Sequence, residues 1–144
     1  MRLASSAIAV SLAVALGGVH AGAAAQEAAA PAYEKVVFDA SVLFDAYQSN
    51  LLPAGRATLD AFLGRVRGLV TRSVIAIGYA ERLGSTPSSQ VLSEERVDTV
   101  KAYLVANGIA AERITTSRWG ARQPATYAAE RRVFIEISGS RLAP

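Results

Sequence analysis

The sequence predicts an α/β fold, a two-layer βαβαββ sandwich in which two main helices pack on a mixed four-stranded sheet. Three observations support this prediction. Four segments have the composition of strands, two segments carry apolar residues at helical spacing, and the six elements follow the order strand, helix, strand, helix, strand, strand. One domain is expected, because the chain has only 144 residues.

The first half of the chain supplies two strands and one helix. A strand is expected at residues 35–44, where alternate residues such as Val37 and Phe38 point to opposite faces. Pro53 suits the first turn of a helix. One apolar stripe then follows on that helix, formed by Leu59, Phe62, Leu63, Val66 and Val70. The next strand is expected at residues 73–80, and its continuous apolar run at 74–77 is typical of a strand buried on both faces.

The second half begins with a polar loop and a second helix. One of Ser85, Ser88 and Ser89 is expected to cap this helix. The helix is expected to end at Asn107-Gly108, a pair typical of a left-handed stop. Two further strands are expected at residues 114–119 and 132–138, the second of them alternating with one solvated face.

A charged residue interrupts the apolar stripe of the second helix. Leu92, Arg96, Val100 and Leu104 recur every four residues and therefore share one face. The guanidinium of Arg96 keeps its charge, so it must either reach water or meet an anion. Glu81 is the nearest candidate carboxylate, because it follows the strand that precedes this helix.

These residues resemble the peptidoglycan-binding OmpA-like domain, in a stand-alone exported form. The resemblance runs from about Val37 to Ile137, and the motif positions that match are Gly78, Tyr79, Gly84, Leu92, Ser93, Arg96, Val100, Leu104, Gly108 and Ile109. A second motif, R-R-V, matches at residues 131–133. Several positions differ from the family pattern: Glu81 replaces an Asp, Ala80 a Thr, Ser89 an Asn and Glu130 an Asn, and Arg118 and Ala121 replace a glycine and a glutamate.

The resemblance implies a ligand and a site. The ligand is the peptide stem of peptidoglycan, recognised through its diaminopimelate, whose side chain ends in one ammonium and one carboxylate. Arg96 is expected to bind the carboxylate with both arms of its guanidinium, and Glu81 is expected to bind the ammonium. Tyr79, Ala80 and Ser89 complete the expected ligand-binding set.

The first residues of the chain resemble a secretory signal. Residues 1–25 contain Arg2, a short apolar region and a small-residue cleavage site, 26–33 form an Ala/Pro linker, and 34–140 form the OmpA-like domain. The expected location is the periplasm, with association to the outer membrane only through partners. No transmembrane segment is expected in the mature chain.

Composition excludes several classes of function. The chain has no cysteine, and its single histidine, His20, lies in the expected signal. Nucleophiles activated by histidine, zinc sites and copper sites are therefore excluded, and no cofactor is expected. Loss of Arg2 would leave 14 basic and 12 acidic residues, a small excess that does not indicate a nucleic-acid partner.

Three classes of function remain open. The favoured one is a non-catalytic module that binds peptidoglycan and contributes to envelope integrity. The second is a degenerate module in which Arg96 and Glu81 form only an ion pair and the domain binds an envelope protein. The third, a carboxylate-based glycan hydrolase, needs two carboxylates across a cleft, and only Glu81 is well placed. We expect an Arg96→Ala change to abolish binding and leave the fold mostly intact.

Overall fold

The computed structural model describes residues 30–82, 85–121 and 130–144. The expected signal at 1–25, residues 26–29 of the expected linker and the motif residue Gly84 lie outside these ranges. The elements, in chain order, are β1 (Tyr33–Leu43), α1 (Pro53–Val66), β2 (Val70–Gly78), α2 (Thr86–Ala106), the 3-10 turn η1 (Ala111–Arg113), β3 (Ile114–Arg118) and β4 (Arg132–Leu142).

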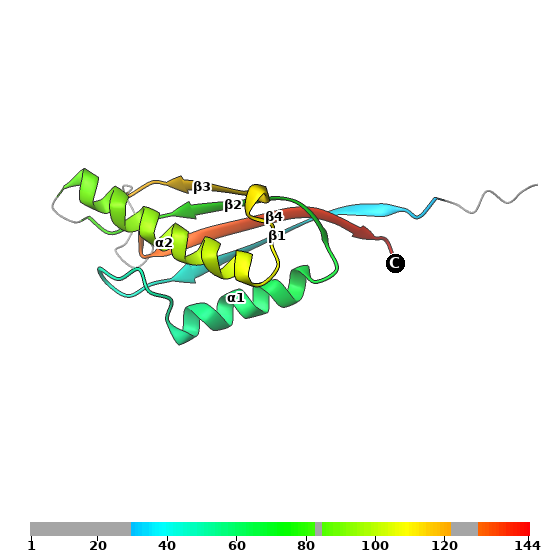
Figure 1. Cartoon of the computed structure of the whole chain (residues 1–144), viewed down its shortest axis with the longest axis horizontal. Coiled ribbons are helices and arrows are strands. Elements are labelled where there is room, and N and C mark those ends of the chain that lie inside the picture. The colour runs from blue at the N-terminus through cyan, green and yellow to red at the C-terminus, as the bar shows by residue number, and fades with distance from the viewer. Residues whose placement is uncertain (1–29, 83–84, 122–129) are drawn as a thin grey trace, which may run out of the picture. The chain divides into compact units, whose positions relative to one another are not determined.

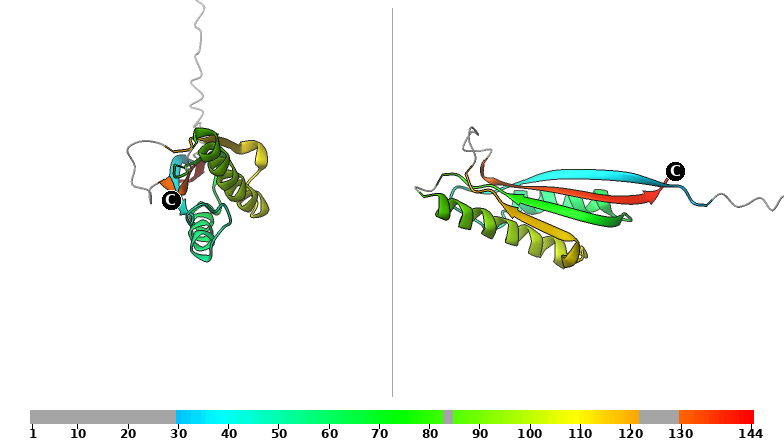
Figure 2. Two further views of the ribbon diagram at one scale, coloured as in Figure 1. Left: turned by 90° about the vertical axis from the view of Figure 1, so that its left-hand side faces the viewer. Right: turned by 90° about the horizontal axis from the view of Figure 1, so that it is seen from above.

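The described strands form one mixed sheet of four strands in the order β1-β4-β2-β3 (Figure 1). β4 is antiparallel to both of its neighbours, whereas β2 and β3 are parallel, as the helical crossover α2 between them requires. Both helices pack against the same face of this sheet (Figure 2). The two-layer α/β sandwich predicted from the sequence is therefore confirmed.

The other face of the sheet is largely open to solvent. Along β1 the side chains alternate, with Val37 exposed and Val42 buried against the helices. The same alternation holds for β2, where Val74 is buried and Ile75 is 39% exposed. The prediction that this strand is buried on both faces was wrong, because the two helices of the described residues both lie on one side of the sheet.

Helix α1 begins at Pro53 as predicted and buries Leu59, Phe62 and Val66. The assignment of Val70 to the same apolar stripe was wrong. Gly68 has a φ of 77°, a left-handed conformation that turns the chain after the helix. Val70 is therefore the first residue of β2.

Helix α2 begins after Ser85, whose hydroxyl accepts a hydrogen bond of 3.3 Å from the amide of Ser88. Its C-terminal stop is confirmed, since Gly108 has a φ of 98°. The helix lies very close to β2 at Gly78, where a Cβ atom would be 2.2 Å from the carbonyl oxygen of Ser93. A residue with no side chain at this position lets α2 approach the sheet.

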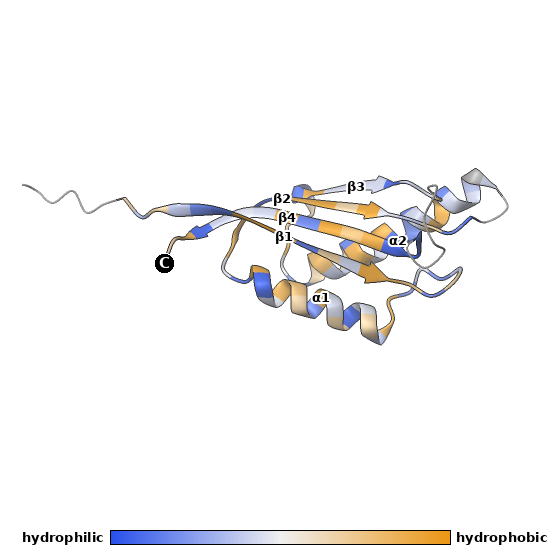
Figure 3. Cartoon of the chain, turned by 180° about the vertical axis from the view of Figure 1, so that it is seen from behind, coloured by the Kyte–Doolittle hydropathy of each residue, from blue (hydrophilic) through white to orange (hydrophobic). Residues whose placement is uncertain are grey.

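The core lies between the helices and the sheet. In Figure 3 the hydrophobic colour runs along β2 and β4. The core consists of Val42, Phe44, Leu59, Phe62, Val66, Val74, Ala76, Val97, Val100, Leu104, Ile114, Val133, Ile135 and Ile137. Over the described parts of the chain, neither α1 nor α2 combines the length and the apolar character that a bilayer-crossing helix needs.

Candidate functional site

Glu81 follows the end of β2, Arg96 lies in the middle of α2, and the two form the predicted pair. In Figure 1 the helix α2 runs alongside β2. The Nη1 atom of Arg96 donates to Oε2 of Glu81 at 3.0 Å, and its Nη2 atom donates to Oε1 at 3.3 Å. The guanidinium therefore binds the carboxylate in a bidentate manner, with one N–H group on each oxygen. Arg96 is fully buried and Glu81 is only 4% exposed, so this ion pair lies in the protein interior.

Three backbone carbonyls complete the surroundings of the guanidinium. Its Nε atom donates to the carbonyl of Gln48 at 2.8 Å, Nη2 to that of Asp45 at 3.0 Å, and Nη1 to that of Tyr79 at 3.1 Å. Together with the two bonds to Glu81 these are five hydrogen bonds, which equals the number of N–H groups on a guanidinium. The ring of Phe44 lies 5.4 Å from the central carbon of the guanidinium and adds a cation–π contact.

The Glu81 carboxylate also accepts a hydrogen bond from the backbone. The amide of Tyr47 donates to its Oε1 atom at 2.5 Å. Burial tends to raise the pKa of Glu81, but the hydrogen bonds from Arg96 and from the Tyr47 amide outweigh burial and hold that pKa below its ordinary value. Glu81 is therefore an anion at neutral pH, and it balances the charge of Arg96.

Tyr47 has an unusual backbone conformation. Its φ is 58°, a positive value that costs free energy in residues other than glycine. This conformation accompanies the hydrogen bond from its amide to the Glu81 carboxylate. The loop between β1 and α1 is further fixed by Thr99 of α2, whose hydroxyl donates to the carbonyl of Ser49 at 2.8 Å.

The other predicted site residues lie around this pair in different ways. The hydroxyl of Ser89 donates to the carbonyl of Glu81 at 3.0 Å, so this side chain fixes the backbone of the carboxylate residue. Ala80 is fully buried, and its methyl group offers no polar contact. Tyr79 contributes its carbonyl to Arg96, whereas its ring lies 5.5 Å from that of Trp119.

Sequence reasoning missed the contribution of the loop between β1 and α1. Asp45, Tyr47 and Gln48 all contact the ion pair, but they do so through backbone atoms, which any residue type supplies. The segment from Phe44 to Pro53 carries the spacing F-D-x-x-x-x-x-L-x-P. That motif was the available signal, although it does not specify hydrogen bonds to Arg96.

A recess lies beside the buried pair, with a volume of about 370 Å³. It is lined by Tyr47, Pro87, Ser88, Val91, Leu92 and Glu95. Tyr47 belongs to both features, because its amide contacts Glu81 and the residue, which is 67% exposed, lines the recess. The recess is also bordered by the first turns of α2, the end of the helix whose dipole favours anions.

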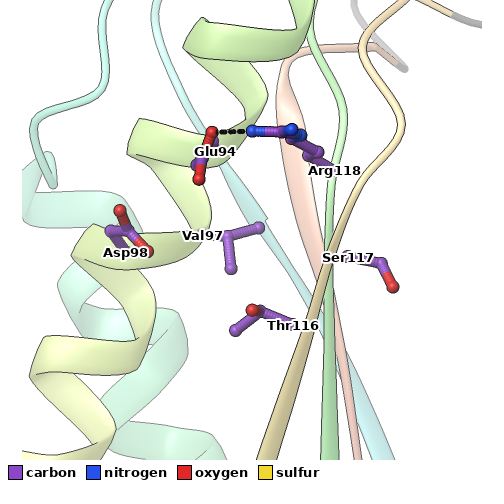
Figure 4. A pocket seen from close by; sticks show the side chains of 6 residues that line it. All are labelled: Glu94, Val97, Asp98, Thr116, Ser117 and Arg118. Carbon is purple, nitrogen blue, oxygen red and sulfur yellow. Dashed lines mark hydrogen bonds and ion pairs between the residues drawn. The ribbon is translucent and has the colours of Figure 1, made fainter.

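A second groove of about 170 Å³ lies between α2 and β3 (Figure 4). It contains an ion pair between Glu94 and Arg118, whose side chains are 49% and 55% exposed. Asp98 lies one helical turn further along the same groove. None of the predicted site residues lines this groove, and exposed pairs of this kind contribute little to stability.

Comparison with known proteins identifies the family. The sequence model described as the OmpA family matches residues 43–136. Outer membrane protein A of Bordetella avium is 39% identical over 131 residues, which cover 86% of this chain and 68% of that protein. The chain belongs to the OmpA family. It spans only 33–48% of the length of several other curated relatives that it matches, so it corresponds to one part of those proteins.

Solved structures agree with this assignment at the level of the fold. The OmpA-like domain of FopA1 from Francisella tularensis has a TM-score of 0.64 and 22% identity, covering 76% of this chain and 78% of that one. The peptidoglycan-associated lipoprotein from Burkholderia pseudomallei has a TM-score of 0.55 and 19% identity, covering 67% and 88%. The resemblance to OmpA-like domains found in the sequence is confirmed, and Arg96 of this OmpA-family chain lies where its motif predicts, on α2 facing the end of β2.

Proposed function

We propose that this chain is a non-catalytic module that binds peptidoglycan in the periplasm. It recognises the diaminopimelate of the stem peptide and contributes to the integrity of the cell envelope. The observation that carries this proposal is the buried pair of Arg96 and Glu81, held 3.0 Å apart beside a recess of about 370 Å³.

The chemistry of the pair suits the end of a diaminopimelate side chain. That end carries a carboxylate and an ammonium on one carbon, so its receptor needs one cation and one anion a short distance apart. In the complex that we propose, Arg96 forks the ligand carboxylate and Glu81 accepts from the ligand ammonium. Tyr79 and Ala80, which precede Glu81, and Ser89 of α2 position these two groups.

The comparisons support the class of ligand and the location. A protein of the same fold is named a peptidoglycan-associated lipoprotein, and a relative with 39% identity is named an outer membrane protein. The first 25 residues resemble a secretory signal. We therefore propose an exported protein that acts in the periplasm and reaches the outer membrane through its partners.

One observation favours a second candidate function. All five N–H groups of Arg96 already have acceptors inside the domain. A pair satisfied in this way also suits a purely structural role. The second candidate is therefore a module that keeps the fold, binds an envelope protein and does not bind the cell wall.

Co-sedimentation with purified sacculi tests the proposal and separates the two candidates. The protein without residues 1–25 is expected to sediment with sacculi that contain diaminopimelate and to stay in solution with sacculi that contain lysine. A lysine side chain lacks the carboxylate and leaves Arg96 without its ligand. Sedimentation with neither kind of sacculus would reject cell-wall binding and favour the envelope-protein module.

A variant at the second ion pair provides the matched control. Arg118→Ala removes an arginine from an exposed Arg–Glu pair, outside the set of residues proposed to bind the ligand. This variant is expected to sediment like the natural protein. A loss of binding in Arg118→Ala would place the ligand in the groove between α2 and β3 and overturn the assignment to Arg96.

A further inference from the structure

We infer that Glu81 is a built-in occupant of a carboxylate site at Arg96. Its side chain holds the position that a ligand carboxylate takes, so a ligand enters only by displacing it. The identity of the natural ligand rests on the proposed function, whereas the existence of the carboxylate site does not.

The geometry around Glu81 is that of a carboxylate receptor. Three N–H groups converge on its two oxygens, two from the guanidinium of Arg96 and one from the backbone of Tyr47. A forked guanidinium and a backbone amide are the donors that proteins use to bind free carboxylates and phosphates. Here the same chain provides both the receptor and the carboxylate that fills it.

The occupied site leaves no donor of Arg96 for a second anion. The remaining three N–H groups of the guanidinium donate to the carbonyls of Asp45, Gln48 and Tyr79. These carbonyls belong to the backbone and hold the guanidinium in its plane. A ligand carboxylate that binds Arg96 as a fork must therefore replace Glu81 and not one of the carbonyls.

The receptor has supports that do not depend on the Glu81 carboxylate. The Ser89 hydroxyl donates to the backbone carbonyl of Glu81 at 3.0 Å. The Thr99 hydroxyl donates to the carbonyl of Ser49 at 2.8 Å and so holds the loop between β1 and α1. These two bonds stay in place when the Glu81 carboxylate leaves Arg96. The recess lined by Tyr47 and Glu95 shares Tyr47 with the pair, and we propose that the ligand approaches from this recess.

Chemical rescue with acetate tests the receptor without any cell-wall ligand. Glu81→Ala removes the CH2–COO⁻ part of the side chain, which is matched in size and charge by acetate. We expect acetate, compared with chloride at equal ionic strength and neutral pH, to raise the Tm of Glu81→Ala by about 4–8 °C at an acetate concentration about five times its dissociation constant. The natural protein, whose site is occupied, is expected to show no such difference.

Two variants control this rescue. Glu94→Ala makes the same substitution at the exposed pair with Arg118, and it is expected to show no response specific to acetate. The double variant Glu81→Ala/Arg96→Met removes the cation together with the occupant and is likewise expected to show none. Absence of rescue in folded Glu81→Ala, or rescue of equal size in the double variant, would overturn the inference.

The affinity for the stem peptide provides a second test of the inference. If Glu81→Ala does not fold, this test is sufficient by itself. Glu81→Asp keeps the charge but shortens the side chain by one methylene, which weakens its hold on Arg96. Calorimetry with a diaminopimelate-containing stem peptide is expected to give about tenfold tighter binding than for the natural protein, a difference of about 1.4 kcal/mol. Equal or weaker binding by Glu81→Asp would show that Glu81 does not compete with the ligand.

The two tests also distinguish this inference from the proposed function. Rescue by acetate without peptide binding by any variant would support the carboxylate site and reject the cell-wall ligand. Peptide binding by the natural protein without rescue of Glu81→Ala would support the ligand and reject the occupied receptor.

Discussion

Arg96 and Glu81 meet at 3.0 Å inside the domain, although 15 residues of loop and helix separate them in the chain. The sequence suggested this pairing but left open whether the Arg96 guanidinium reaches water. Full burial changes the energetics of the pair, because charges removed from water are stable only with a complete set of partners.

The stability of the domain should fall in acid because Glu81 titrates. The pKa of Glu81 is held below its ordinary value in the folded protein. Its contribution to stability is therefore complete above the unfolded pKa of about 4.3 and is lost as the pH falls through the lower folded pKa. We expect the free energy of unfolding in urea to decrease from neutral pH to about pH 2, and to decrease less in Glu81→Gln. Parallel pH profiles for the two proteins would contradict this account of the pair.

Arg96→Ala should destabilise the fold strongly. The change leaves the Glu81 carboxylate buried without its cation, and such losses cost about 3–5 kcal/mol. This result would revise the expectation from the sequence that the fold stays mostly intact. Urea unfolding of Arg118→Ala, at an exposed pair, is the control and should show a loss of at most about 1 kcal/mol. Similar losses in the two variants would mean that burial does not strengthen the pair.

Gly78→Ala should destabilise the packing of α2 on the sheet. The new methyl group would lie 2.2 Å from the carbonyl oxygen of Ser93, so the helix would have to move. We expect a loss of about 1–3 kcal/mol in the free energy of unfolding. Gly64→Ala is the matched control, because a Cβ atom there has no neighbour within 4 Å and alanine favours a helix. A stable Gly78→Ala protein would show that the helix has room to shift.

The exported protein should begin at Gln26. Residues 1–25 have the charge, the apolar run and the small residues of a secretory signal. The intact mass of the protein recovered from the periplasm measures the cleavage directly. A mass that includes residues 1–25 would mean that the segment is retained.

The sequence predicted the fold and the centre of the site because both depend on side-chain type. The helical spacing of Leu92, Arg96 and Val100 placed a cation on a core-facing stripe, and all three residues are buried. Glu81 was identified because a buried cation needs an anion, and Glu81 is the carboxylate that follows the preceding strand. The structure confirms that these two side chains meet, whereas their contact with a ligand stays a prediction.

The parts that the sequence did not predict depend on backbone atoms and on which face is covered. The carbonyls of Asp45 and Gln48 bind Arg96, but carbonyls are common to all residues. The run at residues 74–77 is equally apolar on both sides, so composition could not show that Ile75 faces solvent. Val70 continued the helical spacing by chance. The chain turns at Gly68, so Val70 lies in a strand.

The guanidinium of Arg96 joins segments that are distant along the chain, and this has a consequence for the order of folding. Its bonds to Asp45, Gln48 and Tyr79 span 51, 48 and 17 residues. Contacts across such long loops tend to form late, after the loop-closure entropy has been overcome by other packing. An interaction that is absent from the transition state changes the rate of unfolding more than the rate of folding. The buried pair should therefore form late in folding, and its main kinetic effect should be a slower unfolding of the native domain.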